Sequence, residues 1–421
     1  MRPLRIGYLT AGDSHDVLNW SGLAKHIRDA LEGCGHDVQE IDGCYPKMPL
    51  TTRVRGWRSR FILKKPYGYD CDVELARRFA RLAERKIADL FLDCIVSAQT
   101  YPAAMLRTNI PVASWSDTTF HALTAVHPGY AEISEDSIRQ GHYLERNSIR
   151  RSCFLAYASH WAAADAIAYY GADPAKVAVV PFGANCSSAF ASLDAAEFAV
   201  HSKPVTPFRL LFVGRDWERK GGPLAVCIVA ALRQRGVDAE LWVVGCRPFA
   251  AEPPVGVKCF GYLDKSRSDD LTVWRRCFRE CHALLLPTRA EWFGVVCAEA
   301  AAFGLPSLAT RIGGVADAVA DQVSGFLFAR DDGADPYVDE LERLASDRGY
   351  YRQAAMSAYR YHLRALNWRT AASRFTDLLL RRLDRQKPTE VAQRDTVPWS
   401  ERAFAEDTLV SIQGSKFKVS G

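Results

Sequence analysis

The sequence lacks an apolar run long enough to predict a membrane-spanning helix. None of its apolar stretches reaches the roughly 18–20 residues of a membrane-spanning helix. The first ten residues, from Met1 to Thr10, carry a charge inside their apolar run and have no small-residue cleavage site. They predict a first β-strand and not a secretory signal.

Patterns typical of metal sites and disulfide frameworks are also missing. The 12 cysteines are scattered, with no C-x-x-C pair and no cysteine–histidine cluster at zinc spacing. Several fall within apolar segments, where a thiol acts as a small hydrophobic group. We therefore expect reduced thiols, a cytoplasmic protein and no bound metal.

Two common nucleotide-binding loops are absent. No G-x-x-x-x-G-K-[ST] segment occurs, and no G-x-G-x-x-G follows the first expected strand. A Walker-type nucleotide site is therefore excluded, and a dinucleotide dehydrogenase has little support. The net charge of +5 is mild for 421 residues, so it does not indicate a nucleic-acid partner, and we expect none.

What is present is the composition of an ordinary globular protein, with 48% hydrophobic and 24% charged residues. A chain of 421 residues is too long for one typical core, so two domains are expected. Strand-like apolar segments alternate with helical patterns. The expected strands lie at 5–10, 37–41, 93–97, 111–115, 156–159, 177–180, 208–214, 239–244, 257–260, 283–287, 307–310 and 325–328.

This alternation predicts an α/β protein with two doubly wound parallel sheets. We expect a first domain at 1–200 and a second at 201–370, with a cleft between them. The mixed segment 187–207 is interpreted as the connection. Helical patterns continue to about residue 383, and 386–421 is polar and aperiodic, which predicts a flexible tail.

Two glutamates frame the most informative segment. Glu291 follows the expected strand 283–287, and Glu299 follows eight positions later, within the helix that Gly294 and Val295 open. Ligands bind at the carboxyl ends of strands in open α/β sheets, and helix N-termini favour anions. Two acids around such a helix start can bind two polyols with a phosphate between them. The alternative is that Glu291 caps the helix and Glu299 is a solvated residue.

Basic residues follow the first strand of the second expected sheet. Gly214 ends that strand, and Arg215 and Lys220 come next, beside the glycine-rich start of a helix. Such cations can bind a diphosphate, because arginine chelates two oxygens and lysine supplies a compact charge. Alternatively, Arg215 pairs with Asp216 or Glu218 on a solvated loop. We expect Arg219 to face solvent.

The spacing Glu291-x7-Glu299 resembles the E-x7-E motif of retaining glycosyltransferases of family 4, which have the GT-B fold. The resemblance covers roughly residues 4–385 and is strongest at 208–330. Further matching motifs are Pro181-Phe182-Gly183, Gly214-Arg215, Lys220-Gly221, Phe260-Gly261, Pro287-Thr288, Gly313-Gly314 and Ser324-Gly325.

The resemblance implies a donor site for a nucleoside diphosphate sugar. Glu291 would bind hydroxyls of the sugar, and Glu299 those of the ribose. Backbone groups of Phe293, Gly294 and Val295 would meet the donor. The nucleobase would be flanked by Phe260, Gly261 and Tyr262. The last helix, 371–385, would cross back to the first domain, as in other GT-B proteins.

In the first domain, the resemblance assigns the loop Trp20-Ser21-Gly22 to the diphosphate, with Gly22 allowing close approach. Ser21 also suits a helix N-cap, and the two roles are compatible. The family often has a His-Asp pair after the strand at 111–115. Here that pair is Ser116-Asp117, so the acid is present and the histidine is absent. His121 or His160 could take its place, and the sequence leaves this open.

Similarly, Asp317 stands where the family usually has a longer glutamate, which makes a ligand role for it doubtful.

Residues 53–65 hold six basic side chains and no acid, interleaved with apolar ones. Such a segment could contact the inner face of an anionic membrane or receive a lipid-linked acceptor. A solvated mobile loop is an equally good interpretation, and nucleic-acid binding has no supporting motif.

The resemblance thus implies a metal-independent, retaining glycosyltransferase for polysaccharide biosynthesis, whose partners are a nucleotide-sugar donor and a glycan or lipid-linked acceptor. No cofactor is expected, because Arg215 and Lys220 supply the positive charge. One rival is a GT-B-fold sugar-nucleotide epimerase. Another is a non-catalytic nucleotide-sugar-binding protein.

Overall fold

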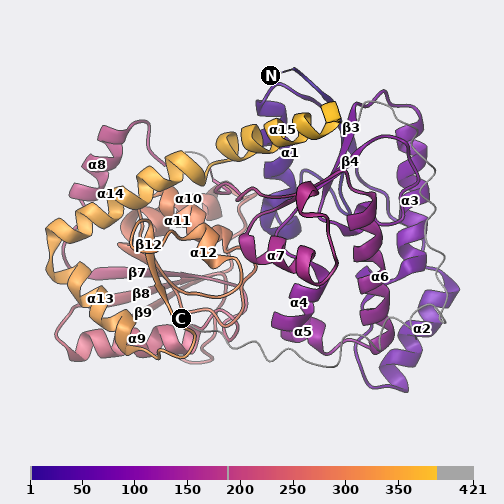
Figure 1. Cartoon of the computed structure of the whole chain (residues 1–421). Coiled ribbons are helices and arrows are strands. Elements are labelled where there is room, and N and C mark those ends of the chain that lie inside the picture. The colour runs from indigo at the N-terminus through magenta and orange to yellow at the C-terminus, as the bar shows by residue number, and fades with distance from the viewer. Residues whose placement is uncertain (1, 187–188, 386–421) are drawn as a thin grey trace. The chain divides into compact units, whose positions relative to one another are not determined.

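The computed structural model describes residues 2–186 and 189–385 and contains two parallel β-sheets of six strands (Figure 1). The tail expected at 386–421 lies outside the described residues. The strand order of the first sheet is β2-β1-β3-β4-β5-β6, and that of the second is β12-β11-β10-β7-β8-β9. All pairings in both sheets are parallel.

The first sheet consists of β1 (Arg5–Leu9), β2 (Asp37–Ile41), β3 (Cys94–Ala98), β4 (Val112–Ser116), β5 (Phe154–Tyr157) and β6 (Val177–Val179). The second consists of β7 (Phe208–Val213), β8 (Ala239–Val244), β9 (Val257–Gly261), β10 (Ala283–Leu286), β11 (Ser307–Thr310) and β12 (Gly325–Phe328). Every expected strand is present to within a few residues. Strands such as β3 are buried at each position, as expected for parallel sheets covered on both faces.

Helices connect the strands. In the first half they are α1 (Leu23–Gly33), α2 (Leu50–Phe61), α3 (Val73–Ala88), α4 (Phe120–Val126), α5 (Pro128–Ala131), α6 (Glu135–Arg151), α7 (His160–Ala168) and α8 (Leu193–His201). In the second half they are α9 (Gly222–Gln234), α10 (Ser268–Glu280), α11 (Val295–Ala302), α12 (Val315–Ala318), α13 (Asp335–Ser346), α14 (Arg348–Ala365) and α15 (Trp368–Arg385).

Five of these helices were not expected from the sequence: α2, α4, α5, α6 and α8. The reason is clearest in α6, whose buried face includes Ser137, Gln140, Asn147 and Ser148. A helix that buries polar and small side chains shows no apolar period in its sequence. The segment 187–207, interpreted as a mixed connection, contains α8, which Ser192 caps by accepting a hydrogen bond from the amide of Ala195.

The last helix packs against the first sheet. In Figure 1, α15 lies beside α1. The ring of Phe375 in α15 stacks on that of Trp115 in β4, with centroids 4.7 Å apart. Thr376 Oγ1 lies 3.0 Å from His36 Nε2, just before β2. The first sheet ends with β6 (Val177–Val179) and the second begins with β7 (Phe208–Val213). The division into domains at 1–200 and 201–370 stays a prediction.

Strand order places a crevice in each sheet. The chain reverses direction across the first sheet between β1 and β3, and across the second between β7 and β10. At such switch points the loops after neighbouring strands diverge to opposite faces of the sheet, which leaves room for a ligand outside the carboxyl ends. The loops after β1 and β3 in the first sheet, and after β7 and β10 in the second, therefore define where a site should be sought.

Candidate functional site

A cavity of about 470 Å³ lies at the carboxyl ends of both sheets. The first sheet contributes Trp20, Ser21 and Asp117 to its lining. The second sheet and its helices contribute nine of the residues selected from the sequence: Gly214, Arg215, Lys220, Tyr262, Glu291, Phe293, Gly294, Val295 and Glu299. The hypothesis from the sequence requires Arg215 and Glu291 to lie on the same side of the second domain. Both residues line this one cavity.

Three selected glycine or aromatic positions do not line this cavity. Gly22 adjoins Ser21, which does, and Gly261 precedes Tyr262, which does. Phe260 packs instead against Trp242, with ring centroids 5.1 Å apart. Of the three residues expected to flank a nucleobase, Tyr262 is therefore the one that faces the cavity.

Lys220 and Glu291 form an ion pair at the centre of the site. Lys220 Nζ donates to Glu291 Oε2, and both side chains are largely buried. Two close backbone approaches fix this geometry. A Cβ on Gly221 would lie 1.8 Å from the carbonyl oxygen of Pro287, and one on Gly313 would lie 1.8 Å from that of Glu291. Both glycines have positive φ, which other residues adopt only at a cost.

Arg215 makes no ion pair within the described part of the chain. Its Nη2 donates to the hydroxyl of Tyr262 at 2.8 Å, and its guanidinium lies 4.6 Å from the centroid of that ring. The pairing with Asp216 or Glu218 that we considered from the sequence does not form, since these acids pair with Arg219 and Arg289. The charge of Arg215 is therefore exposed at the cavity without a carboxylate.

The prediction that Arg219 faces solvent is wrong. Its Nη1 donates to the carbonyl oxygen of Ala290 at 2.8 Å, and its guanidinium lies 5.1 Å from the ring centroid of Trp292. The side chain is 14% exposed and lines the cavity. It holds the segment just before Glu291, and this contact between distant loops leaves no signal in the sequence.

Glu299 is buried and has a partner that sequence reasoning missed. Lys265 Nζ donates to Glu299 Oε1 at 2.5 Å and lies 4.3 Å from the ring centroid of Trp274. Burial raises the pKa of Glu299, while the charge and hydrogen bond of Lys265 lower it. The alternative of a solvated Glu299 is therefore wrong. The sequence signal that could have identified this partner was a lysine just after the carboxyl end of β9.

Asp117 reaches the cavity from the first sheet. Trp20 Nε1 donates to Asp117 Oδ2 at 3.0 Å. Burial raises the pKa of Asp117 to about 6, the Trp20 hydrogen bond opposes this rise, and the charge of Glu291 adds to it. The carboxyl group therefore keeps its proton to a higher pH than a solvated aspartate does.

The loop that carries Trp20 has an unusual backbone. Trp20, Ser21 and Gly22 have φ values of 48°, 58° and 81° in succession. Left-handed conformations of non-glycine residues cost about 1–3 kcal/mol and persist only where neighbours enforce them. Here the side chain of Asn185 donates to the carbonyl oxygen of Ser21 at 2.8 Å. Gly22, not Ser21, is the N-cap of α1, and no side chain caps that helix.

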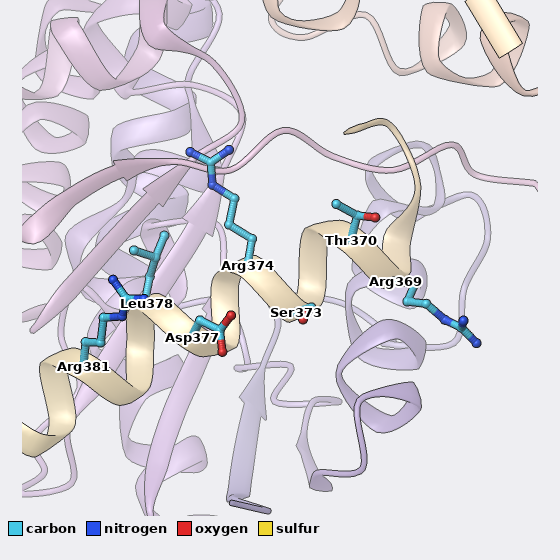
Figure 2. A pocket seen from close by; sticks show the side chains of 7 residues that line it. All are labelled: Arg369, Thr370, Ser373, Arg374, Asp377, Leu378 and Arg381. Atoms are coloured by element: carbon cyan, nitrogen blue, oxygen red, sulfur yellow. The ribbon is translucent and has the colours of Figure 1, made fainter. Parts of the chain in front are cut away.

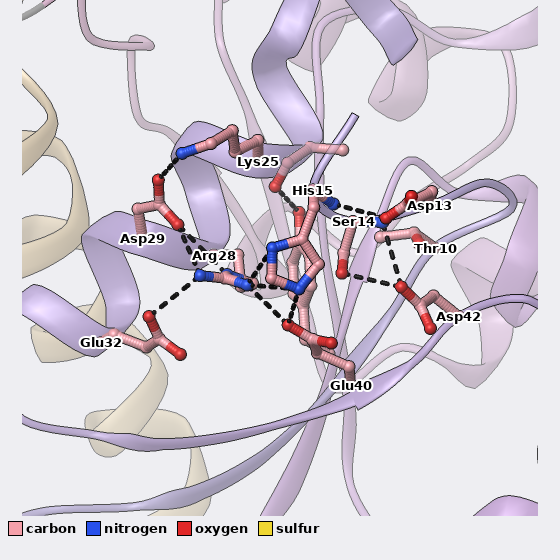
Figure 3. Close-up of polar contacts among 12 residues, drawn as sticks. Thr10, Asp13, Ser14, His15, Lys25, Arg28, Asp29, Glu32, Glu40 and Asp42 are labelled. Atoms are coloured by element: carbon pink, nitrogen blue, oxygen red, sulfur yellow. Dashed lines mark hydrogen bonds and ion pairs between the residues drawn. The ribbon is translucent and has the colours of Figure 1, made fainter. Parts of the chain in front are cut away.

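A polar network anchors the same loop at its start (Figure 3). The backbone N–H and hydroxyl of Ser14 both donate to Asp42 Oδ2, at 3.1 and 2.8 Å. Arg28 of α1 and His15 of the loop both contact Glu40 Oε1 in β2, at 2.6 and 2.8 Å. The network ties the loop to β2 and α1, which supports the strained turn that follows.

Neither histidine considered as a replacement lines the cavity. His121 Nδ1 lies 2.6 Å from Asp165 Oδ1, and its ring stacks on Tyr169 with centroids 3.6 Å apart. His160 is 82% exposed at the start of α7, and its Nδ1 lies 2.5 Å from Asp317 Oδ1. Asp317 thus joins α12 to α7 and does not line the cavity either.

A second hollow, of about 510 Å³, follows α15 (Figure 2). All of its lining residues belong to that one helix: Arg369, Thr370, Ser373, Arg374, Asp377, Leu378 and Arg381. It is an open groove without groups converging from other elements. Among the described residues there is no cluster of three or more histidine, cysteine or acidic side chains placed to hold a metal ion.

Within the same residues, no helix combines the length and apolarity that spanning a membrane requires.

Solved structures share this fold. Sucrose-phosphate synthase from Thermosynechococcus elongatus aligns with a TM-score of 0.66 and 16% identity, over 91% of this chain and 100% of that one. Anabaena HepE, solved with UDP and glucose, aligns with a TM-score of 0.58 and 16% identity, over 90% and 100%. These alignments and the two parallel sheets confirm the predicted GT-B fold.

Several glycosyltransferases are similar to this chain in sequence. The D-inositol 3-phosphate glycosyltransferase of Arthrobacter sp. (strain FB24) is 31% identical over 50% of this chain and 51% of its own length. That of Corynebacterium efficiens is 28% identical over 62% and 64%. The chain thus spans between half and two thirds of these relatives. Residues 207–347 match the family model of the group 1 glycosyl transferases.

Proposed function

We propose that this chain is a retaining glycosyltransferase of family 4. It moves a sugar from a nucleoside diphosphate sugar to a hydroxyl of a glycan or glycolipid acceptor, without a metal ion. The observation that carries the proposal is one cavity that holds Arg215, Lys220, Glu291 and Glu299 at the carboxyl ends of the strands. The D-inositol 3-phosphate glycosyltransferases and HepE, solved with UDP-glucose, support it as relatives in sequence or fold.

The two cations are suited to the donor diphosphate. Arg215 has no carboxylate partner among the described residues, so its guanidinium can bind phosphate oxygens directly. Lys220 reaches the same cavity from the start of α9 and is held by Glu291. A hydrogen bond to a charged group contributes about 1.5–3 kcal/mol. Because negative charge grows on the leaving diphosphate, these contacts strengthen in the transition state and raise the rate.

The acids are suited to the two polyols of the donor. When a phosphate of the donor replaces Glu291 as the partner of Lys220, the Glu291 carboxylate becomes free to bind hydroxyls of the transferred sugar. Glu299, beside Lys265, binds the ribose hydroxyls. Phe293, Gly294 and Val295 at the start of α11 line the same cavity, where their backbone N–H groups would meet the donor. Tyr262, which also lines it, would flank the nucleobase. Gly214 ends β7 where the diphosphate would approach.

The reaction breaks the bond between the anomeric carbon and the diphosphate oxygen, and it forms a bond between that carbon and the acceptor oxygen. The acceptor's proton passes to the leaving diphosphate. Asp117 faces the sugar from the first sheet, and Trp20 fixes its position. Closure around both substrates would exclude water and suppress hydrolysis of the donor.

A donor screen followed by a transfer assay tests this function. Sugar nucleotides that raise the melting temperature are incubated with candidate glycan and glycolipid acceptors, and products are analysed by mass spectrometry. Lys220→Ala and Glu291→Gln should each lower transfer by about 100-fold or more, as loss of a charge-stabilising contact does. The surface variant Lys258→Ala serves as the control. Full activity in either site variant, epimerisation of the donor, or an unchanged donor would each refute the proposal.

A further inference from the structure

The helix α2 (Leu50–Phe61) buries its polar side and exposes its apolar side. Its buried residues are Thr52, Gly56 and Ser59, which recur at the spacing of one helix face. A helix on the surface of a globular protein normally shows the opposite arrangement. The exposed apolar residues of α2 therefore have no role in the core of this protein.

Polar contacts fix this reversed orientation. Thr52 Oγ1 donates to Asp72 Oδ1 at 2.9 Å, and Ser59 Oγ donates to the carbonyl oxygen of Lys65 at 2.8 Å. Gly56 allows close packing, because a Cβ there would lie 2.3 Å from the hydroxyl oxygen of Tyr69. Rotating α2 to bury its apolar side would break these contacts.

The exposed side is a continuous apolar stripe. Leu50, Val54, Trp57 and Phe61 follow one another at intervals of four, three and four residues, so they lie on a single face. Their exposed fractions are 74%, 56%, 57% and 63%. Ile62 and Leu63 extend the stripe beyond the helix and are also exposed. Such contiguous apolar surface marks an interaction site.

Cations border the stripe. At 3.6 residues per turn, Arg53 and Arg60 lie on one flank and Arg58 on the other, and Lys64 follows. Within the described ranges 2–186 and 189–385, these four exposed cations have no carboxylate at ion-pair distance. The other two basic residues of the segment, Arg55 and Lys65, pair with Asp72 and Glu135 at 3.5 and 3.8 Å.

We propose that this face of α2 docks on a membrane surface that contains anionic phospholipids. In that position the apolar stripe enters the acyl boundary, and the flanking cations meet headgroup phosphates on both sides. A nucleic acid would meet its cations only at the borders of an apolar centre, which is a poor match. A 12-residue helix is about 18 Å long, so it lies in the interface and does not span the bilayer.

The inference rests on α2 and its neighbours and does not require the proposed glycosyl transfer. If both hold, docking brings the chain to the surface where a lipid-linked acceptor lies. The alternative of a solvated mobile loop for residues 53–65 is wrong for 53–61, which are helical.

Vesicle flotation with the full chain tests the proposal. We expect binding to vesicles made of phosphatidylglycerol and phosphatidylcholine in equal parts, and not to vesicles of phosphatidylcholine alone. Trp57→Ser combined with Phe61→Ser should lower binding at least tenfold. Arg53→Gln combined with Arg58→Gln should lower it by up to about 25-fold at low salt, at about fivefold per cation, and less at high salt.

The matched controls remove equally exposed groups elsewhere. Phe91→Ser with Phe198→Ser removes two aromatic rings that are 80% and 74% exposed, and Arg279→Gln with Arg330→Gln removes two exposed charges. Both controls should bind vesicles as the wild type does. Circular dichroism and the melting temperature verify that each variant is folded.

Several results would overturn the inference. They are failure of the wild type to bind anionic vesicles, equal binding by the Trp57/Phe61 variant, and equal loss in the controls. A dimer that depends on Trp57 and Phe61, with no vesicle binding, would instead assign the stripe to a second copy of the chain. Because the assay uses neither donor nor acceptor, its outcome is separate from that of the transfer assay.

Discussion

Replacing Lys265 by methionine isolates the buried charge of Glu299. Methionine keeps the length and the apolar stem of lysine, so its packing on Trp274 is largely retained. What is lost is the 2.5 Å hydrogen bond and the positive charge beside a carboxylate that is 4% exposed. The variant therefore leaves an ionised acid inside the protein with a smaller counter-charge.

The expected cost follows from the burial of the two partners. Breaking a buried ion pair costs about 3–5 kcal/mol, because one charge remains uncompensated. Lys265 is 27% exposed, so water already screens part of the interaction, and we expect about 2–3 kcal/mol. At about 2–4 °C per kcal/mol, the melting temperature should fall by about 4–12 °C.

The effect should depend on pH in a defined direction. Burial raises the pKa of Glu299 above the value it has in the unfolded chain, so the folded protein keeps this proton to a higher pH. Ionised Glu299 therefore lowers stability as the pH rises above about 4.5, the ordinary pKa of a glutamate. The charge of Lys265 counteracts the increase in the pKa of Glu299. Removing Lys265 therefore enlarges the loss of stability at high pH. The deficit of Lys265→Met should be largest near pH 8 and should shrink toward pH 4.5.

Thermal unfolding between pH 4.5 and pH 8 measures this effect. The matched control is Lys258→Met, which removes a lysine that is 54% exposed and pairs with Glu240 at 2.8 Å. An exposed pair contributes about 0–1 kcal/mol, so the control should change little. Combining Lys265→Met with Glu299→Gln should restore most of the stability. If Lys265→Met costs no more than Lys258→Met, or costs the same at all pH values, the reasoning is refuted.

Two further changes test the surroundings of the site. Trp20→Phe removes a hydrogen bond that lowers the pKa of Asp117, so the acid limb of the transfer rate should move above pH 6, and an unchanged profile would exclude Asp117 from the reaction. Gly313→Ala places a methyl group 1.8 Å from the carbonyl oxygen of Glu291, so transfer should fall at least tenfold. Full activity would show that the loop can move to accommodate the methyl group.

Glu145→Gln should flatten the pH dependence of stability. Burial raises the pKa of Glu145 to about 7, so the wild type loses stability as the pH rises from about 4.5 to 7. In the variant this part of the slope disappears, because glutamine does not ionise. Its side-chain oxygen can still accept the hydrogen bond of Thr100, so the fold is retained. A melting temperature that falls equally in both proteins between pH 5 and pH 8 would contradict the assignment.

The site illustrates how far sequence reasoning extends. Arg215, Lys220 and Glu291 each follow a strand or open a helix, so the position of a single strand end is enough to place them. The partner of Glu299 could not be found in this way, because Lys265 lies 34 positions away on the loop after another strand. Arg219 was misplaced for the same reason, since its contacts come from residues 71 and 73 positions later.

The sequence by itself determined the fold class, because strands buried on both faces must be apolar at nearly every position and such runs alternate with helical patterns. It also determined the acids and cations that stand at strand ends. The tertiary structure alone decided which of them meet, since strand order at the two switch points selects the loops that share a cavity. It also decided that α2 turns its apolar side outward, because this depends on distant partners such as Asp72 and not on the periodicity of the helix.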